Sequence, residues 1–307
     1  MKKVLFILLS LTSMLLASQN SIQVWSADNS KGKITAKSIE EAFNSVGLDV
    51  LANNNMNKPF KLRFKKTHYK VYNLAIFMNN DLTLKLIKKY PQFGVLSPMT
   101  MSIWSDGKTI NISTLSLKGM SRTTGIPFKN KTLREYAVLI QKALKKAMPH
   151  GHFKKLPYKD HDDAKSYLVS FSMPVEYEED QSPGDFEENF EDEFTGELEP
   201  LGFLFPNYLN LKEDIFEDAG YEAYDFFNTL SICKFDVIFP VSRLHPEVGA
   251  YAPCTFYIYK KKNEKEMHMG FLGVENWIET ADIEDDASIK PLKEAQGMIK
   301  KVIEEMK

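Results

Sequence analysis

A nine-residue pattern that occurs twice constrains the fold of this chain more than any other sequence feature. The stretch Tyr90–Pro98 reads YPQFGVLSP, and His245–Pro253 reads HPEVGAYAP. Two prolines and a glycine recur at an offset of 155 residues (246 minus 91): Pro91, Gly94 and Pro98, then Pro246, Gly249 and Pro253. An apolar stretch, a turn and a second strand-like stretch follow both copies. This order predicts a duplicated folding unit.

Further matches flank the repeated pattern. Tyr69-Lys70-Val71-Tyr72 resembles Tyr221-Glu222-Ala223-Tyr224. Each half also closes with an amphipathic pattern, at Thr132–Met148 and at Pro291–Met306, with an offset of 159 (292 minus 133). At 307 residues the chain has the length of two ordinary domains. We therefore predict a first module over 30–150, a linker over 151–200 and a second module over 201–307.

The expected fold class is α+β, with two similar modules whose helices pack on an antiparallel sheet. Strand-like and helical stretches do not alternate regularly along the first module, which argues against parallel βαβ units. Asp106-Gly107 between two apolar stretches is a strong hairpin signal. The expected elements of the first module, in chain order, are a helix over Ser38–Leu51, a strand over Phe60–His68, a strand over Val71–Phe77, a helix over Leu82–Lys89, a hairpin over Met99–Thr114 and the closing helix.

With these features, the stretch Ser38–Met148 resembles the family known as domain of unknown function 302. The resemblance rests on the Pro91-x-x-Gly94-x-x-x-Pro98 turn, the strand after it and the Asp106-Gly107 hairpin. The second half, about Gly202–Lys307, resembles the same family more faintly and lacks the Asp-Gly turn. The resemblance implies a compact α+β fold and a tendency to self-associate. It implies no activity.

The N-terminus has the pattern of a secretion signal over residues 1–17. Lys2 and Lys3 precede an apolar stretch from Val4 to Leu16, and Ala17 is the expected last residue removed. An uncleaved N-terminal anchor is the alternative. No later stretch is apolar enough to span a membrane. We therefore expect a periplasmic or secreted protein with no membrane span after signal removal.

The formal net charge of −2 hides a strong difference between the halves. Residues 19–175 hold 25 Lys and Arg against 10 Asp and Glu, a net charge of +15. Residues 176–307 hold 12 against 31, a net charge of −19. Opposite charges predict that the halves attract each other, most strongly at low salt. The basic residues follow no nucleic-acid-binding motif, so no nucleic-acid partner is expected.

The acidic excess is concentrated in residues 176–199, where 12 of 24 residues are Asp or Glu and none is basic. Phe186, Phe190 and Phe194 recur every four positions, as apolar residues on one face of a helix do. The tract is either a solvated spacer or an acidic strap lying on the basic first module. Like charges at this density oppose ordering, which favours the spacer.

Two sets of residues could hold a crosslink or a metal. Cys233 and Cys254, the only cysteines, either form a disulfide or stay as buried thiols. His150, His152 and His161 lie near Asp162 and Asp163, and these residue types can bind zinc or copper. Their position in a polar connection favours a surface loop without metal. We expect no cofactor.

The repeated turn is the remaining candidate site, because a loop between a helix and a strand can present backbone N–H groups to a ligand. The alternative is that its prolines and glycine only set the backbone path. The sequence contains no known catalytic motif. It therefore favours an exported binding or interaction protein of unknown ligand, with its modules packed as a pseudo-dimer. An enzyme with a site in one module and a structural component of an envelope complex remain alternatives, with a small ligand or an envelope protein as the expected partner.

Overall fold

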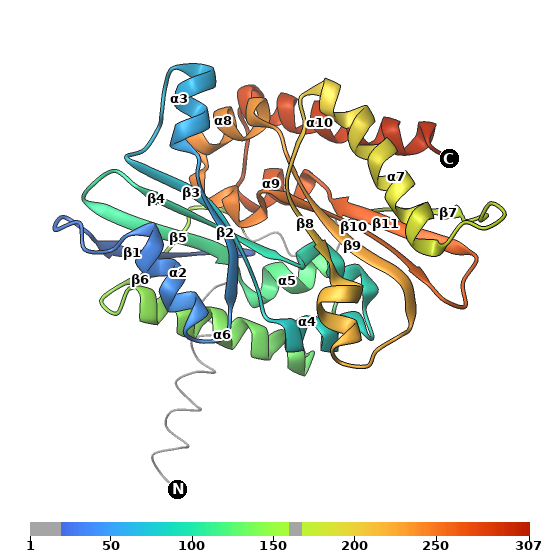
Figure 1. Cartoon of the computed structure of the whole chain (residues 1–307). Helices are drawn as coiled ribbons and strands as arrows, with labels where there is room; N and C mark the ends of the chain where they lie inside the picture. The colour runs from blue at the N-terminus through green and yellow to red at the C-terminus, as the bar shows by residue number, and fades with distance from the viewer. Residues whose placement is uncertain (1–19, 160–167) are drawn as a thin grey trace, which may run out of the picture.

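The computed structural model describes residues 20–159 and 168–307, which we call the first and second half. The predicted signal over residues 1–17 and the residues His161, Asp162 and Asp163 lie outside these ranges. Each half contains one antiparallel sheet. In the view of Figure 1, helices α2, α4 and α6 of the first half lie below the sheets, and α7, α8 and α10 of the second half lie above them. The predicted α+β class is confirmed.

The first sheet has six strands in the order β2-β3-β4-β5-β1-β6. They are β1 Ile22–Asp28, β2 Asp49–Asn55, β3 Val71–Met78, β4 Met99–Ser105, β5 Thr109–Leu115 and β6 His152–Lys154. The helices of this half are α2 Ala36–Asn44, α3 Asn57–Phe64, α4 Asn80–Ile87, the 3-10 turn η1 Pro91–Leu96, α5 Leu117–Thr124 and α6 Lys131–Ala147.

The second sheet has five strands in the order β7-β11-β10-β9-β8. They are β7 Leu168–Pro174, β8 Leu204–Asn210, β9 Tyr224–Cys233, β10 Cys254–Lys261 and β11 Glu266–Leu272. The helices are α7 Pro183–Leu198, η2 Glu199–Leu201, the π-helical η3 Lys212–Glu217, α8 Phe235–Leu244, η4 Pro246–Tyr251, α9 Glu275–Thr280 and α10 Asp286–Glu305.

The two sheets have the same strand order when the second is read from its other edge. The series β2-β3-β4-β5-β1 then corresponds to β8-β9-β10-β11-β7. Asn53 faces Ala75 across the first pair of strands, and Tyr208 faces Leu230 across the second, 155 residues later (208 minus 53). Both repeated turns form a 3-10 helix that ends before a cis proline. The arrangement of strands therefore agrees between the halves.

This register corrects one of the sequence matches. Val71 pairs with Ser105, and Phe226 pairs with Lys260, so the common offset of 155 extends through these strands. Tyr72 then corresponds to Phe227 and not to Tyr224, which the sequence suggested. Tyr221 and Tyr224 therefore resemble Tyr69 and Tyr72 in sequence but do not occupy the same structural positions. The chain before β9 passes through η3 and follows a different path from the chain before β3.

Two elements of the first half differ from the prediction. The helix expected over Ser38–Leu51 ends at Asn44, and the residues expected as a strand over Phe60–His68 instead form most of α3. The prediction missed β1 and β6, which lie outside the stretch Ser38–Met148 that it covered. It also missed β2, an edge strand whose Asn53, Asn54 and Asn55 lack the apolar alternation of a half-buried strand. The strand over Val71–Phe77 and the hairpin over Met99–Thr114 are confirmed by β3, β4 and β5.

The acidic tract is not the solvated spacer that its charge favoured. Ser182 and Asp185 form a capping box at the start of α7, and Phe190 and Phe194 on one face are buried. The ring of Phe194 stacks on Phe256 of β10 with 4.4 Å between centroids. The tract does not lie on the first half as a strap either, since α7 packs against β9 and α10. The cap and the aromatic contacts outweigh the like-charge repulsion.

The two halves meet through their repeated turns. Turn η4 contacts β4 and β5 of the first sheet, and η1 contacts β10 and β11 of the second. Thr100 donates a hydrogen bond to the carbonyl of Ala250 at 2.6 Å, and Thr255 donates to that of Pro98 at 3.4 Å. These two threonines lie 155 residues apart, so the same residue of each half contacts the other half's turn.

Two ion pairs join basic residues of the first half to acidic residues of the second. Arg63 contacts Asp236 at 2.6 Å, and Arg122 contacts Glu279 at 2.8 Å. The first pair is exposed, and the side chain of Arg122 is buried. Across residues 20–159 and 168–307, no helix is long and apolar enough to span a membrane.

Candidate binding site

The six residues of the repeated turns lie at the contact between the halves. A Cβ atom on Gly249 would lie 2.4 Å from the Cβ of Ser102, and one on Gly94 would lie 3.0 Å from that of Tyr257. Only glycine permits approaches this close. Pro91 and Pro246 begin the 3-10 turns, and Pro98 and Pro253 precede β4 and β10. Their positions are those of residues that set a backbone path.

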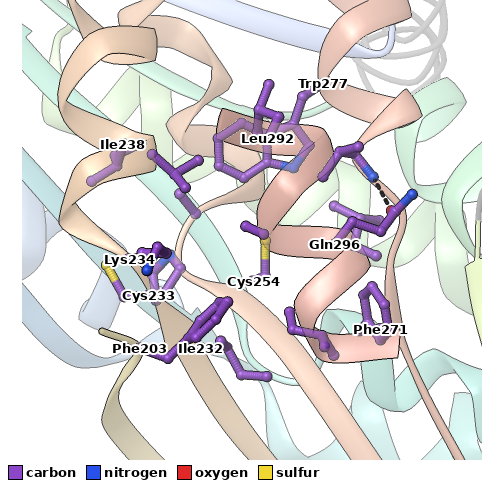
Figure 2. A pocket seen from close by; sticks show the side chains of 17 residues that line it. Phe203, Ile232, Cys233, Lys234, Ile238, Cys254, Phe271, Trp277, Leu292 and Gln296 are labelled. Atoms are coloured by element: carbon purple, nitrogen blue, oxygen red, sulfur yellow. Dashed lines mark hydrogen bonds between the residues drawn. The ribbon is translucent and has the colours of Figure 1, made fainter. Parts of the chain in front are cut away.

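An apolar cavity of about 60 Å³ lies in the second half, between the sheet and the helices α8, α9 and α10. Ile232 and Cys254 line it from the strands, Ile238 from α8 and Leu292 from α10. Figure 2 shows these side chains converging on one space, with the Trp277 ring lying across its upper side. Of the six turn residues, Pro253 alone contributes to this lining.

The cavity exists because the two closing helices carry different residues at one position. The buried positions of α6 and α10 match at an offset of 159, which pairs Tyr136 with Ala295. Tyr136 is fully buried, and its hydroxyl accepts a hydrogen bond from the Asn79 backbone N–H at 2.7 Å. Ala295 instead lines the cavity. The tyrosine ring thus fills space in the first half that remains open in the second.

A smaller residue in the second half enlarges the same space. Cys254, which lines the cavity, corresponds to Met99 at the offset of 155. The two residues begin the strands β10 and β4. Removing side-chain volume from a core leaves a cavity wherever the surrounding residues do not collapse into it. The sequence therefore encodes a more open core in the second half than in the first.

Polar groups around the cavity are few, and most have partners. Gln296 accepts a hydrogen bond from the Val274 N–H at 2.8 Å and donates one to Glu275 at 3.2 Å. The ammonium group of Lys234 lies over the Phe203 ring and donates to the carbonyl of Leu201. The indole nitrogen of Trp277 has no hydrogen-bond partner within the described ranges, although the residue is only 3% exposed.

The two cysteines are free thiols in the structure. Cys254 pairs directly with Ile232 across the sheet, so the next residue, Cys233, points to the opposite face. Figure 2 shows the two sulfur atoms apart, a geometry unlike that of a disulfide. Burial raises the pKa of both thiols to about 12, which keeps them protonated at neutral pH. They behave as small apolar residues.

A larger cleft of about 540 Å³ opens beside the cavity, at the joint between the halves. Asn53–Asn55 and Lys58 line it from the first half, and Leu204 lines it from β8. Cys233 and Pro253 line both the cleft and the inner cavity. These two residues therefore form a wall that the cavity and the cleft share.

A second group of polar residues lies beneath α7. Asn228 donates hydrogen bonds to the Glu191 carboxylate at 3.0 Å and to the Tyr208 hydroxyl at 2.6 Å. Tyr208 in turn hydrogen-bonds Glu187. Burial, with the Glu213 carboxylate nearby, raises the pKa of Glu187 to about 7. Burial, with Glu187 nearby, raises the pKa of Glu191 to about 8. Both carboxyls therefore hold protons well above the usual range.

The first half has a related network without the second carboxylate. Asn53 donates to Glu40 at 3.1 Å, and Asn73 donates to Asn53 at 2.9 Å. Asn53 and Asn73 correspond to Tyr208 and Asn228 at the offset of 155. In both halves, the network ties the first long helix to the edge strand.

The histidines suggested as metal ligands do not form a centre in the described part of the chain. His150 and His152 are exposed, and His152 lies in β6. The third histidine, His161, lies outside the described residues. No group of three His, Cys, Asp or Glu residues is placed to hold a metal ion anywhere in 20–159 or 168–307.

The sequence comparison missed Trp277 and Ala295, although one signal was available. The offset of 159 that identified the closing helices already pairs Tyr136 with Ala295. An alanine in one half at the position where the other half has a buried tyrosine indicates a more open core in that half. Nothing in the sequence places the Trp277 ring beside that position, because α9 is short and irregular.

Comparisons with known proteins give one family. A DUF302 domain, described as a domain of unknown function, is found at residues 28–149. A similar solved structure is that of an uncharacterized conserved DUF302 protein from Bacillus stearothermophilus, with 13% identity and a TM-score of 0.36. The match covers 45% of this chain and 96% of that one. No curated protein matches the chain.

Proposed function

We propose that this is an exported binding protein, built from two copies of one domain that pack as a pseudo-dimer, with its ligand site in the second copy. The ligand is a small, mostly apolar molecule that occupies the cavity beside Ala295. The observation that carries this proposal is the pairing of Tyr136 with Ala295, because one core is filled where the other is open.

The common strand order and the offset of 155 support the duplication. The second copy keeps the turn of the first, and Gly249 stands where Gly94 stands. The copies differ in net charge and at the core position that holds Tyr136 in one and Ala295 in the other. A divergent second copy of the DUF302 domain accounts for both the agreement and the difference.

The contacts of the repeated glycines support the pseudo-dimer. Gly94 lies against Tyr257 of the other half, and Gly249 lies against Ser102. Adding 155 to Gly94 and Ser102 gives Gly249 and Tyr257, so the same contact is made in both directions. Reciprocal contacts of this kind are the feature of an interface with two-fold symmetry. The opposite net charges of the halves also favour their packing against each other.

The nature of the walls supports a small apolar ligand. Apolar cavities stay dry and bind apolar molecules, and an engineered cavity of about 150 Å³ holds benzene. The space here is smaller, so it fits a molecule of a few heavy atoms or the end of a longer one. The cleft at the joint supplies the route, since Cys233 and Pro253 line both spaces. Export rests on the charged and apolar pattern of residues 1–17.

The test uses isobutene as an apolar probe and methyl NMR spectra of the full mature chain. Isobutene is expected to shift the methyl signals of Ile238 and Leu292. Ala295→Leu, which fills the space, is expected to abolish these shifts. Gly297→Ala is the matched control on the same helix, because a Cβ there has nothing within 4 Å. Unmoved Ile238 and Leu292 signals in the unmodified chain would overturn the proposal.

A further inference from the structure

The Trp277 indole is the one polar group of the cavity lining that lacks a partner in the described residues and is almost fully buried. Buried polar groups in folded proteins are nearly always hydrogen-bonded, and leaving a donor unpaired costs about 1–3 kcal/mol. Figure 2 shows the indole at the edge of the cavity, on the side facing Gln296. The amide of Gln296 is already engaged by Val274 and Glu275.

Trp277 is one of several buried side chains with an unpartnered nitrogen or oxygen in the described residues, and it is the one among them that lines the cavity. The indole nitrogen of Trp25 donates to the carbonyl of Met148 at 3.1 Å. Ser102 pairs with Ser113 in the first sheet and Tyr257 with Gly270 in the second, so the offset becomes 157 from β5 and β11 onward (270 minus 113). This offset matches Trp277 with Met120, which carries no donor. The first half therefore has neither the open space nor the unpaired N–H. The second half has both the open space and the unpaired N–H.

A buried water is a poor partner for this donor. An enclosed water needs two to four polar partners. Gln296 and Lys234 of the lining already have partners, which leaves the Trp277 N–H and the weakly polar Cys254 thiol. An apolar molecule that carries one acceptor oxygen satisfies the donor and fills the remaining space at once.

We infer that the ligand of the second half carries a single hydrogen-bond acceptor, such as a carbonyl, ether or hydroxyl oxygen, which receives the Trp277 N–H. This inference rests on the proposed function and names the chemical class of its ligand. Trp277 is then the residue that orients the ligand, while Ala295, Ile238 and Leu292 supply the apolar walls.

Acetone and isobutene test the inference, because they have nearly the same shape and only acetone carries an acceptor. The chain contains three tryptophans, so its ¹H–¹⁵N spectrum has three indole signals. Acetone is expected to shift the Trp277 indole signal strongly, and isobutene to shift it little. Trp25, whose indole is already bonded, serves as the internal reference with both probes.

A variant gives the second measurement. Trp277→Phe removes the donor and is expected to weaken acetone binding about three- to tenfold, the value of one net hydrogen bond. The same variant should change isobutene binding less than about twofold, which controls for the change in cavity volume. The desolvation of acetone cancels because each probe is compared with itself.

The outcomes separate the two proposals. If both probes bind but acetone leaves the Trp277 indole signal in place, the acceptor inference is wrong and the binding function stands. If neither probe binds, the binding function fails and the inference fails with it. The indole signal is read on the unmodified chain, so the inference remains testable even if Trp277→Phe does not fold.

Discussion

Tyr136 on α6 and Ala295 on α10 occupy corresponding positions of the two closing helices, and one fills the core space that the other leaves open. The phenol hydroxyl of Tyr136 lies 2.7 Å from the Asn79 nitrogen and 3.3 Å from the Thr83 hydroxyl. Lys234 and Ile238 stand at those two places in the second half. A single helix position therefore separates a closed core from an open one.

Truncation of the Tyr136 side chain tests whether its ring fills the core of the first half. Tyr136→Ala should open a comparable cavity and lower the free energy of unfolding by about 3–5 kcal/mol. Tyr136→Phe should cost only about 1–2 kcal/mol, because it keeps the ring and leaves the Asn79 N–H unpaired. Urea unfolding measures both. Equal losses in the two variants would show that the ring does not fill the space.

The two carboxyls beneath α7 predict a pH-dependent stability. The folded chain holds the protons of Glu187 and Glu191 up to about pH 7 and pH 8, whereas the unfolded chain loses them near pH 4.5. Because the folded state then binds more protons, the free energy of unfolding should fall as pH rises from about 4.5 to about 8. The groups facing the pair are Lys212 and Glu213 of η3, Tyr208, and Glu188 and Asp192 of α7.

Thermal unfolding between about pH 5 and pH 8 measures this effect. The double variant Glu187→Gln, Glu191→Gln should flatten the pH dependence and be the more stable protein at pH 8. Glu193→Gln, an exposed position on the same helix, should leave the dependence unchanged. A pH profile that is the same in the double variant and the unmodified chain would refute the buried carboxyl pair.

The acidic tract shows how far the sequence predicts this fold. The spacing of Phe186, Phe190 and Phe194 already indicated a helix face, and the structure buries Phe190 and Phe194. Charge density alone pointed to a spacer, because it does not reveal that Glu187 and Glu191 stay protonated under the helix. The edge strand β2 was missed for a related reason, since Asn53 bonds to α2 and the strand carries no apolar alternation.

The candidate site was harder to predict than the fold. The repeat located the turns, and the structure places them at the contact between the halves, where Pro253 alone of the six repeated residues lines the cavity. The cavity depends on residues from six separate elements, β9, β10, β11, α8, α9 and α10, that meet only in three dimensions. Of these, Ala295 alone could be found by comparing the copies.

A substitution at Gly249 tests how closely the two halves are packed. Gly249→Ala places a methyl group 2.4 Å from the Ser102 Cβ and 2.7 Å from a Leu74 methyl, neither of which can move freely. We expect it to lower the free energy of unfolding by about 1–3 kcal/mol. Gly297→Ala, in open space on α10, should raise stability by about 0.5–1 kcal/mol. Loss of stability in both variants would argue against the close contact.

The cysteines predict a simple chemical result. Cys233 and Cys254 should react slowly with a thiol reagent at pH 8 in the folded protein, because burial keeps their pKa at about 12. After unfolding without reductant, two thiols per chain should titrate. A value of zero after unfolding would mean that the protein carries the disulfide that the sequence left open.

A crystal structure under xenon pressure tests the central claim most directly, because xenon occupies apolar cavities and needs no chemical partner. The account predicts one xenon atom bounded by Ile238, Cys254 and Leu292, and none beside Tyr136. The Tyr136→Ala variant should hold a second xenon atom in the first half. A second half without xenon under the same pressure would contradict the claim that its core is open for a ligand.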